Sequence, residues 1–292
     1  MDIWPAPAKL NLFLHVVGRR PDGYHLLQTA FQFLDFGDEL AFRVTGDGRI
    51  ARTRELPGVA VEADLTLRAA RALKDVSGAT QGAEITLTKR LPAGGGLGGG
   101  SSDAATTLIA LNRLWGTGLS TPQLAALGLG LGADVPVFVR GHAAWAEGVG
   151  EQLTPLELPQ PWYLVLVPPV QVPTAEIFSE FARQRGLTPY TSPRTIRDLR
   201  AGRTANDLES VTRARYPQVQ RCFELLDACL PESGRAGRPR MTGTGGCVFA
   251  ELIDVDAGKG ALATLPEGFS GFVARGMNRH PLYGTDATGV PD

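Results

Sequence analysis

Apolar and polar positions alternate over residues 8–16, close to the start of the chain. Apolar side chains occupy every second position, and Lys9 and Asn11 lie between them. A period of two is typical of a β-strand with one buried face, so we predict a strand that carries Lys9 and Asn11 together on its other face. The next segment, residues 20–25, is rich in turn formers and predicts a loop that ends in Tyr24 and His25.

Further along the chain, the apolar spacing changes repeatedly between that of strands and that of helices. Helical spacing covers residues 64–74 and 102–115, and Ser120 and Thr121 before Pro122 predict another helix start. Strand-like apolar runs cover residues 27–36, 40–44 and 84–88. In the second half, residues 163–167, 217–230, 248–252, 257–265 and 271–274 predict strand, helix, strand, helix and strand.

Three prolines lie close together between residues 153 and 161 and suggest a domain boundary there. The length of 292 residues also exceeds that of a typical single domain, about 100–200 residues. We therefore predict a mixed α+β protein with one domain over residues 1–155 and another over 156–292. Residues after Asn278 are polar and rich in proline and glycine, and we expect them at the surface.

A segment made almost entirely of glycine lies between the strand at 84–88 and the following helix. Glycine fills every position from 94 to 100 except Leu97. Such a backbone exposes its N–H groups at an entropic cost, and a helix start adds unpaired N–H groups and partial positive charge. This combination predicts a phosphate-binding loop. We expect ATP to be bound by Pro92, Ala93, Gly94, Gly95, Gly96, Leu97, Gly98, Gly99, Gly100, Ser101 and Ser102.

Other readings of this glycine-rich loop are weaker. The Walker motif requires a lysine after the glycines, and none is present. Gly94, Gly96 and Gly99 match the dinucleotide fingerprint, but the acidic residue expected about 20 positions later is missing, because no Asp or Glu lies between Asp103 and Asp134. A flexible linker is also unexpected between a strand and an amphipathic helix.

Two charged residues are candidates for the chemistry of phosphoryl transfer. Transfer to a hydroxyl group requires a cation near the moving phosphoryl group and an acceptor for the hydroxyl proton. Lys9 on its strand fits the first role, and Asp134 at a predicted turn fits the second. Alternatively, Lys9 is a solvated strand lysine and Asp134 only caps the next element.

The composition narrows the classes of protein that remain. Lys plus Arg number 29 and Asp plus Glu 30, which argues against a nucleic-acid-binding protein. The three cysteines form no CxxC pair, so we expect neither a zinc site nor a disulfide framework. With no signal peptide and no apolar run of about 18 residues, we expect a cytoplasmic protein that does not enter a membrane. The sequence carries no indication of an oligomeric state.

Several motifs together resemble the GHMP kinase superfamily. They are Pro5–Leu14, the loop Pro92–Ser102, and the glycine-rich stretch Met241–Phe249. The segments Arg20–His25, Gly132–Phe138 and Ala205–Glu209 are similar to the branch of that superfamily whose substrate carries cytidine diphosphate.

The resemblance implies a fold, a reaction and roles for residues. The fold would be a ribosomal-protein-S5-like N-terminal domain and a ferredoxin-like C-terminal domain, with the active site between them. The reaction would be ATP-dependent phosphorylation, with Mg²⁺, of the 2-hydroxyl of a cytidine-diphosphate-linked erythritol, in the non-mevalonate route to isoprenoid precursors. Asp134 would be the base and Lys9 its electrostatic partner. The substrate would be bound by Asn11, Tyr24, His25 and Thr195.

The chain departs from the family pattern at three positions. Asp64 and Asp103 stand where asparagine is common, and Thr242 stands where serine is frequent. These changes put local nucleotide contacts in doubt but leave the reaction class unchanged, and they identify no metal ligands. Two alternatives remain: another GHMP kinase, acting for example on homoserine or mevalonate, and a nucleotide-binding module that has lost catalysis.

Overall fold

The computed structural model describes residues 2–186 and 190–283. The strands are β1 (Trp4–Arg19), β2 (His25–Thr45), β3 (Ile50–Arg52), β4 (Gly82–Thr88), β5 (Ala144–Glu147), β6 (Gln152–Pro155), β7 (Trp162–Val167), β8 (Arg240–Met241), β9 (Val248–Leu252) and β10 (Ser270–Met277). The helices are α1 (Leu65–Ser77), α2 (Gly99–Leu114), α3 (Thr121–Leu129), α4 (Val135–Arg140), α5 (Thr174–Arg185), α6 (Ile196–Arg200), α7 (Glu209–Arg215), α8 (Pro217–Cys229) and α9 (Val255–Ala263). The predicted mixed α+β class is confirmed.

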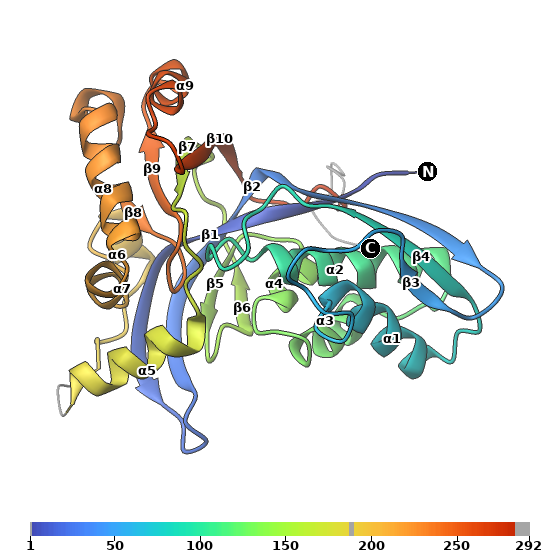
Figure 1. Ribbon diagram of the computed structural model, residues 1–292. Coiled ribbons are helices and arrows are strands. Elements are labelled where there is room, and N and C mark those ends of the chain that lie inside the picture. The colour runs from blue at the N-terminus through green and yellow to red at the C-terminus, as the bar shows by residue number, and fades with distance from the viewer. Residues whose placement is uncertain (1, 187–189, 284–292) are drawn as a thin grey trace.

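The described strands form one sheet that runs through both halves of the chain. Its main order is β3-β4-β2-β10-β7-β9-β8, with β1 and β5 also paired to β2. Strand β10 joins the halves, because it pairs with β7 along its length and with Leu34 and Phe33 of β2 through Gly276 and Met277. The β1–β2 hairpin is the longest feature and crosses the whole molecule (Figure 1).

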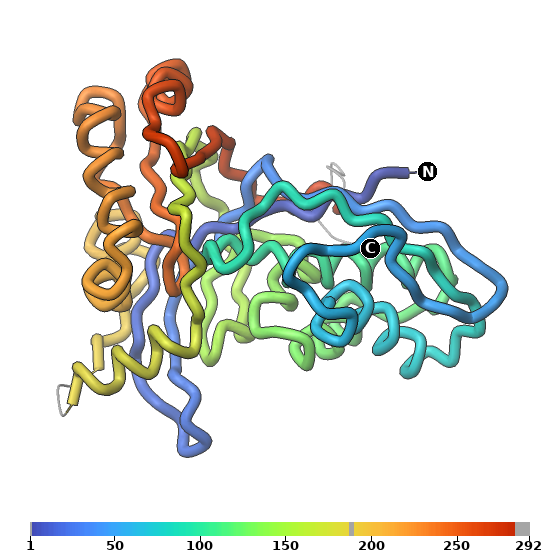
Figure 2. The backbone as a smooth tube through the Cα atoms, viewed as in Figure 1, coloured from blue at the N-terminus to red at the C-terminus, as the bar shows by residue number. Residues whose placement is uncertain are grey.

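Helices cover the sheet in two separate groups. Helices α1–α4 lie beneath the part of the sheet that contains β2 and β4, and α5, α7, α8 and α9 gather at the other end of the molecule (Figure 1). The tube in Figure 2 shows the N-terminal hairpin passing between these two groups. None of the helices in the described part of the chain has the length and apolar content needed to cross a membrane.

Strand β1 contributes to each cluster of buried apolar side chains. Ala6 belongs to the cluster under α1–α4, Leu10 and Phe13 to a central cluster, and Leu14 and Val16 to the cluster beneath α5, α7 and α8. One strand therefore fixes the position of Lys9 relative to both halves of the chain.

The expectations for the strands at 27–44 and for the segment after Asn278 differ from the structure. The predicted strands at 27–36 and 40–44 are parts of the single strand β2, which continues because β4 pairs with its second half. The expectation of a surface position after Asn278 is wrong for His280, which is fully buried and donates its backbone N–H to the oxygen of Gly141 (2.9 Å). Burial lowers the pKa of His280 to about 3. Residues 284–292, also included in that expectation, lie outside the described residues.

Candidate active site

The glycine-rich loop uses backbone conformations that other residues rarely adopt. Gly94, Gly96 and Gly98 have positive φ angles of 68°, 74° and 72°, which favour glycine because a Cβ is disfavoured there. Helix α2 begins at Gly99, earlier than the sequence predicted, so the last glycines form its first turn. The first intrahelical bond is donated by Ser102 N to Gly98 O (2.8 Å). The N–H groups before Ser102 are therefore available to an anion.

The loop packs closely against the third glycine-rich motif. A Cβ on Gly96 would overlap the carbonyl oxygen of Thr242, and a Cβ on Gly95 would lie 2.8 Å from the Cys247 sulfur. Cys247 N also donates to Gly95 O (3.0 Å). The loop is thus held from below by a segment that is far away in the sequence.

Lys9 is buried against this loop, although it lies on a strand. Its backbone N–H donates to Leu97 O (2.9 Å), and its ammonium group donates to Gly96 O (3.1 Å) and to the Asn11 side-chain oxygen (2.5 Å). The Asn11 amide nitrogen in turn donates to the Thr29 hydroxyl (3.0 Å). A side chain that is 3% exposed and held by two acceptors is a fixed cation, which excludes the reading of Lys9 as a solvated strand lysine.

Asp134 immediately precedes α4 and meets Lys9 across the site. Its carboxylate lies 3.2 Å from the Lys9 ammonium and remains 33% exposed, so one face is open to a ligand. The side chain makes no capping bond to α4, which removes the reading of Asp134 as a cap. The structure therefore places the two charged residues that we predicted from the sequence next to each other, beside the glycine-rich loop.

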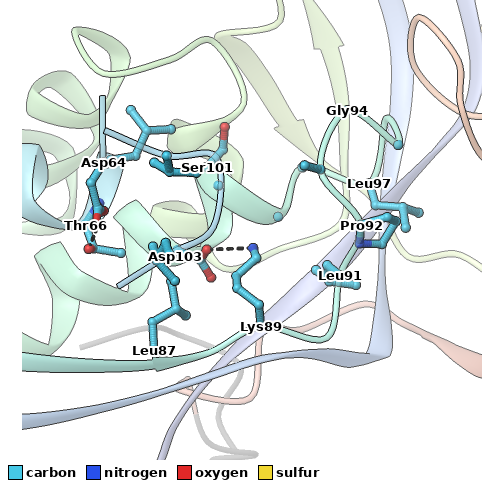
Figure 3. Close-up of a pocket in the computed structure, with 18 of the residues that line it drawn as sticks. Asp64, Thr66, Leu87, Lys89, Leu91, Pro92, Gly94, Leu97, Ser101 and Asp103 are labelled. Atoms are coloured by element: carbon cyan, nitrogen blue, oxygen red, sulfur yellow. Dashed lines mark hydrogen bonds and ion pairs between the residues drawn. The ribbon is translucent and has the colours of Figure 1, made fainter. Parts of the chain in front are cut away.

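The loop and Asp134 line one cavity of about 600 Å³. Apolar side chains from Leu56, Pro57, Val59, Leu65 and Leu87 form one end of it, and the glycine backbone and Asp134 form the other. Figure 3 shows Leu87, Asp64 and Thr66 at the first end and Gly94 and Leu97 on the loop. A pocket that is apolar at one end and rich in N–H groups at the other fits a base and a triphosphate.

Lys89 lies in the wall of this cavity between two carboxylates. Its ammonium group is 2.5 Å from Asp38 and 2.9 Å from Asp103, and the second contact is drawn in Figure 3. Burial raises the pKa of Asp103 to about 7, which the Lys89 charge opposes and the Asp38 charge reinforces. The aspartate that departs from the family pattern is thus accommodated by Lys89, whose role the sequence analysis missed.

The other two departures also keep the local bonding intact. The Asp64 carboxylate caps α1 by accepting from Thr66 N (2.9 Å), and Arg52 lies 3.4 Å from its other oxygen. The Thr242 hydroxyl accepts from Asn11 N (2.9 Å) and donates to Gly96 O (3.2 Å). Because serine offers the same hydroxyl group, Thr242 preserves the link between β1 and the loop.

Tyr24, His25 and Thr195 do not lie beside Lys9. Tyr24 and His25 lie at the far end of the β1–β2 hairpin, where Arg19 pairs with His25, whereas Lys9 pairs with Phe33. Tyr24 is exposed. Thr195 is exposed and caps α6 by accepting from Asp198 N, and the preceding Arg194 N donates to the Gln28 side chain of β2 (2.6 Å).

His25 has aromatic partners that the sequence analysis did not identify. Its ring stacks on Phe178 of α5 with centroids 5.1 Å apart and meets Phe181 edge-on at 6.2 Å. Burial, then the charges of Arg19 and Arg185, lower the pKa of His25. A neutral imidazole between aromatic rings is suited to an uncharged planar ligand. The apolar spacing of α5 alone could not show which strand it faces.

A metal ion would need ligands at the loop. The described residues contain no group of three or more His, Cys, Asp or Glu side chains that could hold one. Buried oxygens without a hydrogen-bond partner are nevertheless present at the start of α2, at Ser102 Oγ and Asp103 Oδ1. Mg²⁺ in ATP-dependent enzymes commonly takes only one or two protein oxygens, with phosphates and water as its other ligands, so these residues fit the ion.

The chain is similar to known proteins. The model of the GHMP kinases N-terminal domain matches residues 64–142. A 4-diphosphocytidyl-2-C-methyl-D-erythritol kinase of Alkalilimnicola ehrlichii is 57% identical over 96% of this chain and 93% of its own length. The kinase of that name from Nitrosococcus oceani is 56% identical over 95% of both chains.

Solved structures agree with these relatives. A crystal structure of 4-(cytidine 5'-diphospho)-2C-methyl-D-erythritol kinase has a TM-score of 0.80 and 32% identity, and it covers 94% of this chain and 99% of its own. A mevalonate kinase structure has a TM-score of 0.69 at 18% identity, which shows the fold alone. The chain is thus an ATP-dependent kinase of the GHMP class. Within that class it belongs to the 4-diphosphocytidyl-2-C-methyl-D-erythritol kinase family.

Proposed function

We propose that this chain transfers the γ-phosphoryl group of ATP to the 2-hydroxyl of 4-diphosphocytidyl-2-C-methyl-D-erythritol, in the non-mevalonate route to isoprenoid precursors. The observation that carries the proposal is the Lys9–Asp134 ion pair of 3.2 Å at the mouth of the glycine-rich loop. Family membership supports the choice of acceptor. The cysteine usage of the sequence supports a cytoplasmic location, since all three cysteines carry free thiols.

Each part of the site has a role in the transfer. The N–H groups of the loop and of the first turn of α2 hold the triphosphate. Asp134 accepts the proton of the 2-hydroxyl while the hydroxyl oxygen forms a bond to the γ-phosphorus. At the same time the bond between the γ-phosphorus and the β-phosphate oxygen breaks, and ADP is released. Lys9 orients the Asp134 carboxylate and stabilises the charge on the moving phosphoryl group.

The remaining residues position the substrates and the metal. Asn11 uses its amide oxygen to hold Lys9 and keeps one amide N–H for the erythritol. Tyr24 and His25, with Phe178, provide aromatic surfaces for the cytosine, and Thr195 lies on the neighbouring segment. Ser102 and Asp103 would hold a Mg²⁺ ion, which would supply neutralisation of the phosphate charge.

A substrate comparison tests the proposed function. Purified protein is incubated with ATP and, separately, with the cytidine compound, mevalonate and homoserine, and ADP and product are followed by mass spectrometry. We expect phosphorylation of the cytidine compound only. Turnover of mevalonate or homoserine without turnover of the cytidine compound would assign the chain to another kinase, and ATP binding without any turnover would favour a non-catalytic module.

A further inference from the structure

A second cavity, of about 790 Å³, is lined by the C-terminal parts of α2 and α4, and its residues have no role in the proposed reaction. Its lining also includes the start of α3 and the segment after β10. Arg113, Arg140 and Arg279 come together there from these separate elements. Among the described residues that line it, Glu157 is the only acidic one, so this part of the lining carries an excess of positive charge.

The arginines are incompletely paired within the described part of the chain. No side-chain hydrogen bond or ion pair involves Arg140 or Arg279 among residues 2–186 and 190–283. Arg113 donates to the carbonyl oxygen of Leu282 (3.3 Å) and has no carboxylate partner in that part of the structure. Glu157 accepts from the amide nitrogen of Asn278 (3.0 Å), and no arginine lies within ion-pair distance of it in the described structure.

Stabilisation of helix ends does not account for all three charges. Arg113 and Arg140 lie in the last turns of α2 and α4, where a cation offsets a partial charge of about −0.5 at each end. Arg279 follows β10 and caps no helix. Three guanidinium groups less one carboxylate leave an excess of about two positive charges, larger than the two helix ends supply. The N-terminus of α3, at Ser120 and Thr121, adds partial positive charge at the same cavity.

Histidine protonation is not needed for this excess. Burial, and then the charge of Arg279, lower the pKa of His142, so its ring is neutral at pH 7. Guanidinium groups bind phosphate through paired N–H donors and keep their charge at all physiological pH values. The chemistry of the lining therefore favours a small ligand with two or more negative charges.

We propose that this cavity binds a small molecule bearing a phosphate or diphosphate group, and that its occupancy is coupled to the catalytic pocket. Helices α2 and α4 carry the coupling. Helix α4 starts after Asp134 and ends at Arg140, and α2 starts on the ATP loop and ends beside Arg113. A shift of either helix end at the second cavity therefore moves a group that the reaction uses.

Binding is tested by calorimetric titration with inorganic pyrophosphate. The ATP pocket is first filled with a non-hydrolysable ATP analogue, so that the glycine-rich loop is not available to the probe. We expect binding to wild type, at least a tenfold rise in Kd for the double variant Arg140→Gln/Arg279→Gln, and no change for the control Arg71→Gln on the exposed face of α1. Crystals soaked with pyrophosphate give a second readout that needs no variant and should show it between Arg140 and Arg279.

The coupling is tested in the kinase assay at constant free Mg²⁺. At saturating ATP, which keeps the probe off the glycine-rich loop, we expect pyrophosphate to change kcat of wild type at least twofold and to leave kcat of the double variant unaffected, while both proteins have the same activity without pyrophosphate. No binding with the ATP pocket filled, or equal binding by the double variant, overturns the site. Binding without any change in turnover overturns the coupling. Because binding is measured without catalysis, the test of the site does not depend on the identity of the acceptor, whereas the test of the coupling rests on the proposed function.

Discussion

At the scale of single residues, the site is defined by a charge that folding has fixed in place. The Lys9 ammonium group donates hydrogen bonds to the loop and to Asn11, and it also forms an ion pair with Asp134. A lysine restrained in this way loses little conformational freedom when the phosphates arrive. This pre-organisation is what electrostatic stabilisation of a transition state requires.

The base role of Asp134 is tested by Asp134→Asn. The amide keeps the shape of the side chain but cannot accept the hydroxyl proton, so we expect kcat to fall by about 10²–10⁴-fold. ATP affinity, measured by titration calorimetry, should be nearly unchanged. Full activity in this variant would remove Asp134 from the reaction.

Lys9→Ala separates catalysis from nucleotide binding. Loss of the ammonium group removes charge stabilisation from the transition state, so kcat should fall by about 10²-fold or more. The Kd for ATP should change much less, because the backbone N–H groups of the loop remain. The opposite pattern, weak ATP binding with normal kcat, would make Lys9 a nucleotide ligand only.

Asp103→Asn should change how stability depends on pH. The raised pKa of Asp103 means that the folded protein binds an extra proton between the unfolded value of 3.8 and about 7. The stability associated with that proton is present at low pH and lost as pH rises through about 7. The melting temperature of the variant minus that of wild type should therefore increase between pH 5 and pH 8, by a few degrees, at about 2–4 °C per kcal/mol.

An exposed carboxylate provides the control for this measurement. Asp75→Asn, on the surface of α1, should shift the melting temperature equally at both pH values. A difference for Asp103→Asn that stays constant with pH would show that Asp103 is ionised throughout the range.

At the scale of elements, the glycine-rich loop depends on its fit against the third motif. Gly96 combines a positive φ with direct backbone contact to Thr242. We expect Gly96→Ala to raise KM for ATP at least tenfold and to lower the free energy of unfolding, because the new methyl group must displace one of the two segments. Kinetics and denaturant unfolding measure both effects.

Gly118→Ala is the matched control for this substitution. Gly118 has a similar φ of 69°, but a Cβ there would meet nothing within 4 Å. Gly118→Ala should therefore lower the free energy of unfolding by about 1–2 kcal/mol, because alanine disfavours the left-handed backbone conformation, and it should leave KM for ATP normal. Equal effects of both substitutions would mean that packing of the loop against Thr242 contributes nothing.

Many of the helices and strands could be predicted from the sequence, because the patterns that indicate them involve only neighbouring residues. The alternation around Lys9 and the run of glycines before an amphipathic helix depend on neighbouring residues, and both elements are present. The start of α2 at Gly99 was missed because glycine has low helix propensity, whereas here packing decides. Lys89 and Phe178 were missed because their partners, Asp103 and His25, lie on other elements, and no local pattern reveals such pairs.

At the scale of the whole molecule, strand β10 makes the two halves one sheet. It pairs with β7 and also with the end of β2, and the segment after it continues to Tyr283, whose hydroxyl donates to Val139 O. The burial of His280 belongs to the same arrangement. The polar composition of the segment after Asn278 could not predict the burial of His280, because other elements of the fold create the space that this residue fills.

This shared sheet predicts cooperative unfolding. Since β1 contributes to all three buried clusters, neither half keeps its core when the other unfolds. Differential scanning calorimetry should therefore show a single transition with equal calorimetric and van't Hoff enthalpies. Two separated transitions would show that residues 1–155 and 156–292 unfold as independent domains.

The most direct measurement of the central claim is a crystal structure with a non-hydrolysable ATP analogue and the cytidine substrate. We predict the triphosphate on Gly94–Ser102 and the 2-hydroxyl oxygen within about 3 Å of the Asp134 carboxylate, the reach of a general base. Nucleotide bound away from the loop, or a different hydroxyl group facing Asp134, would contradict the account.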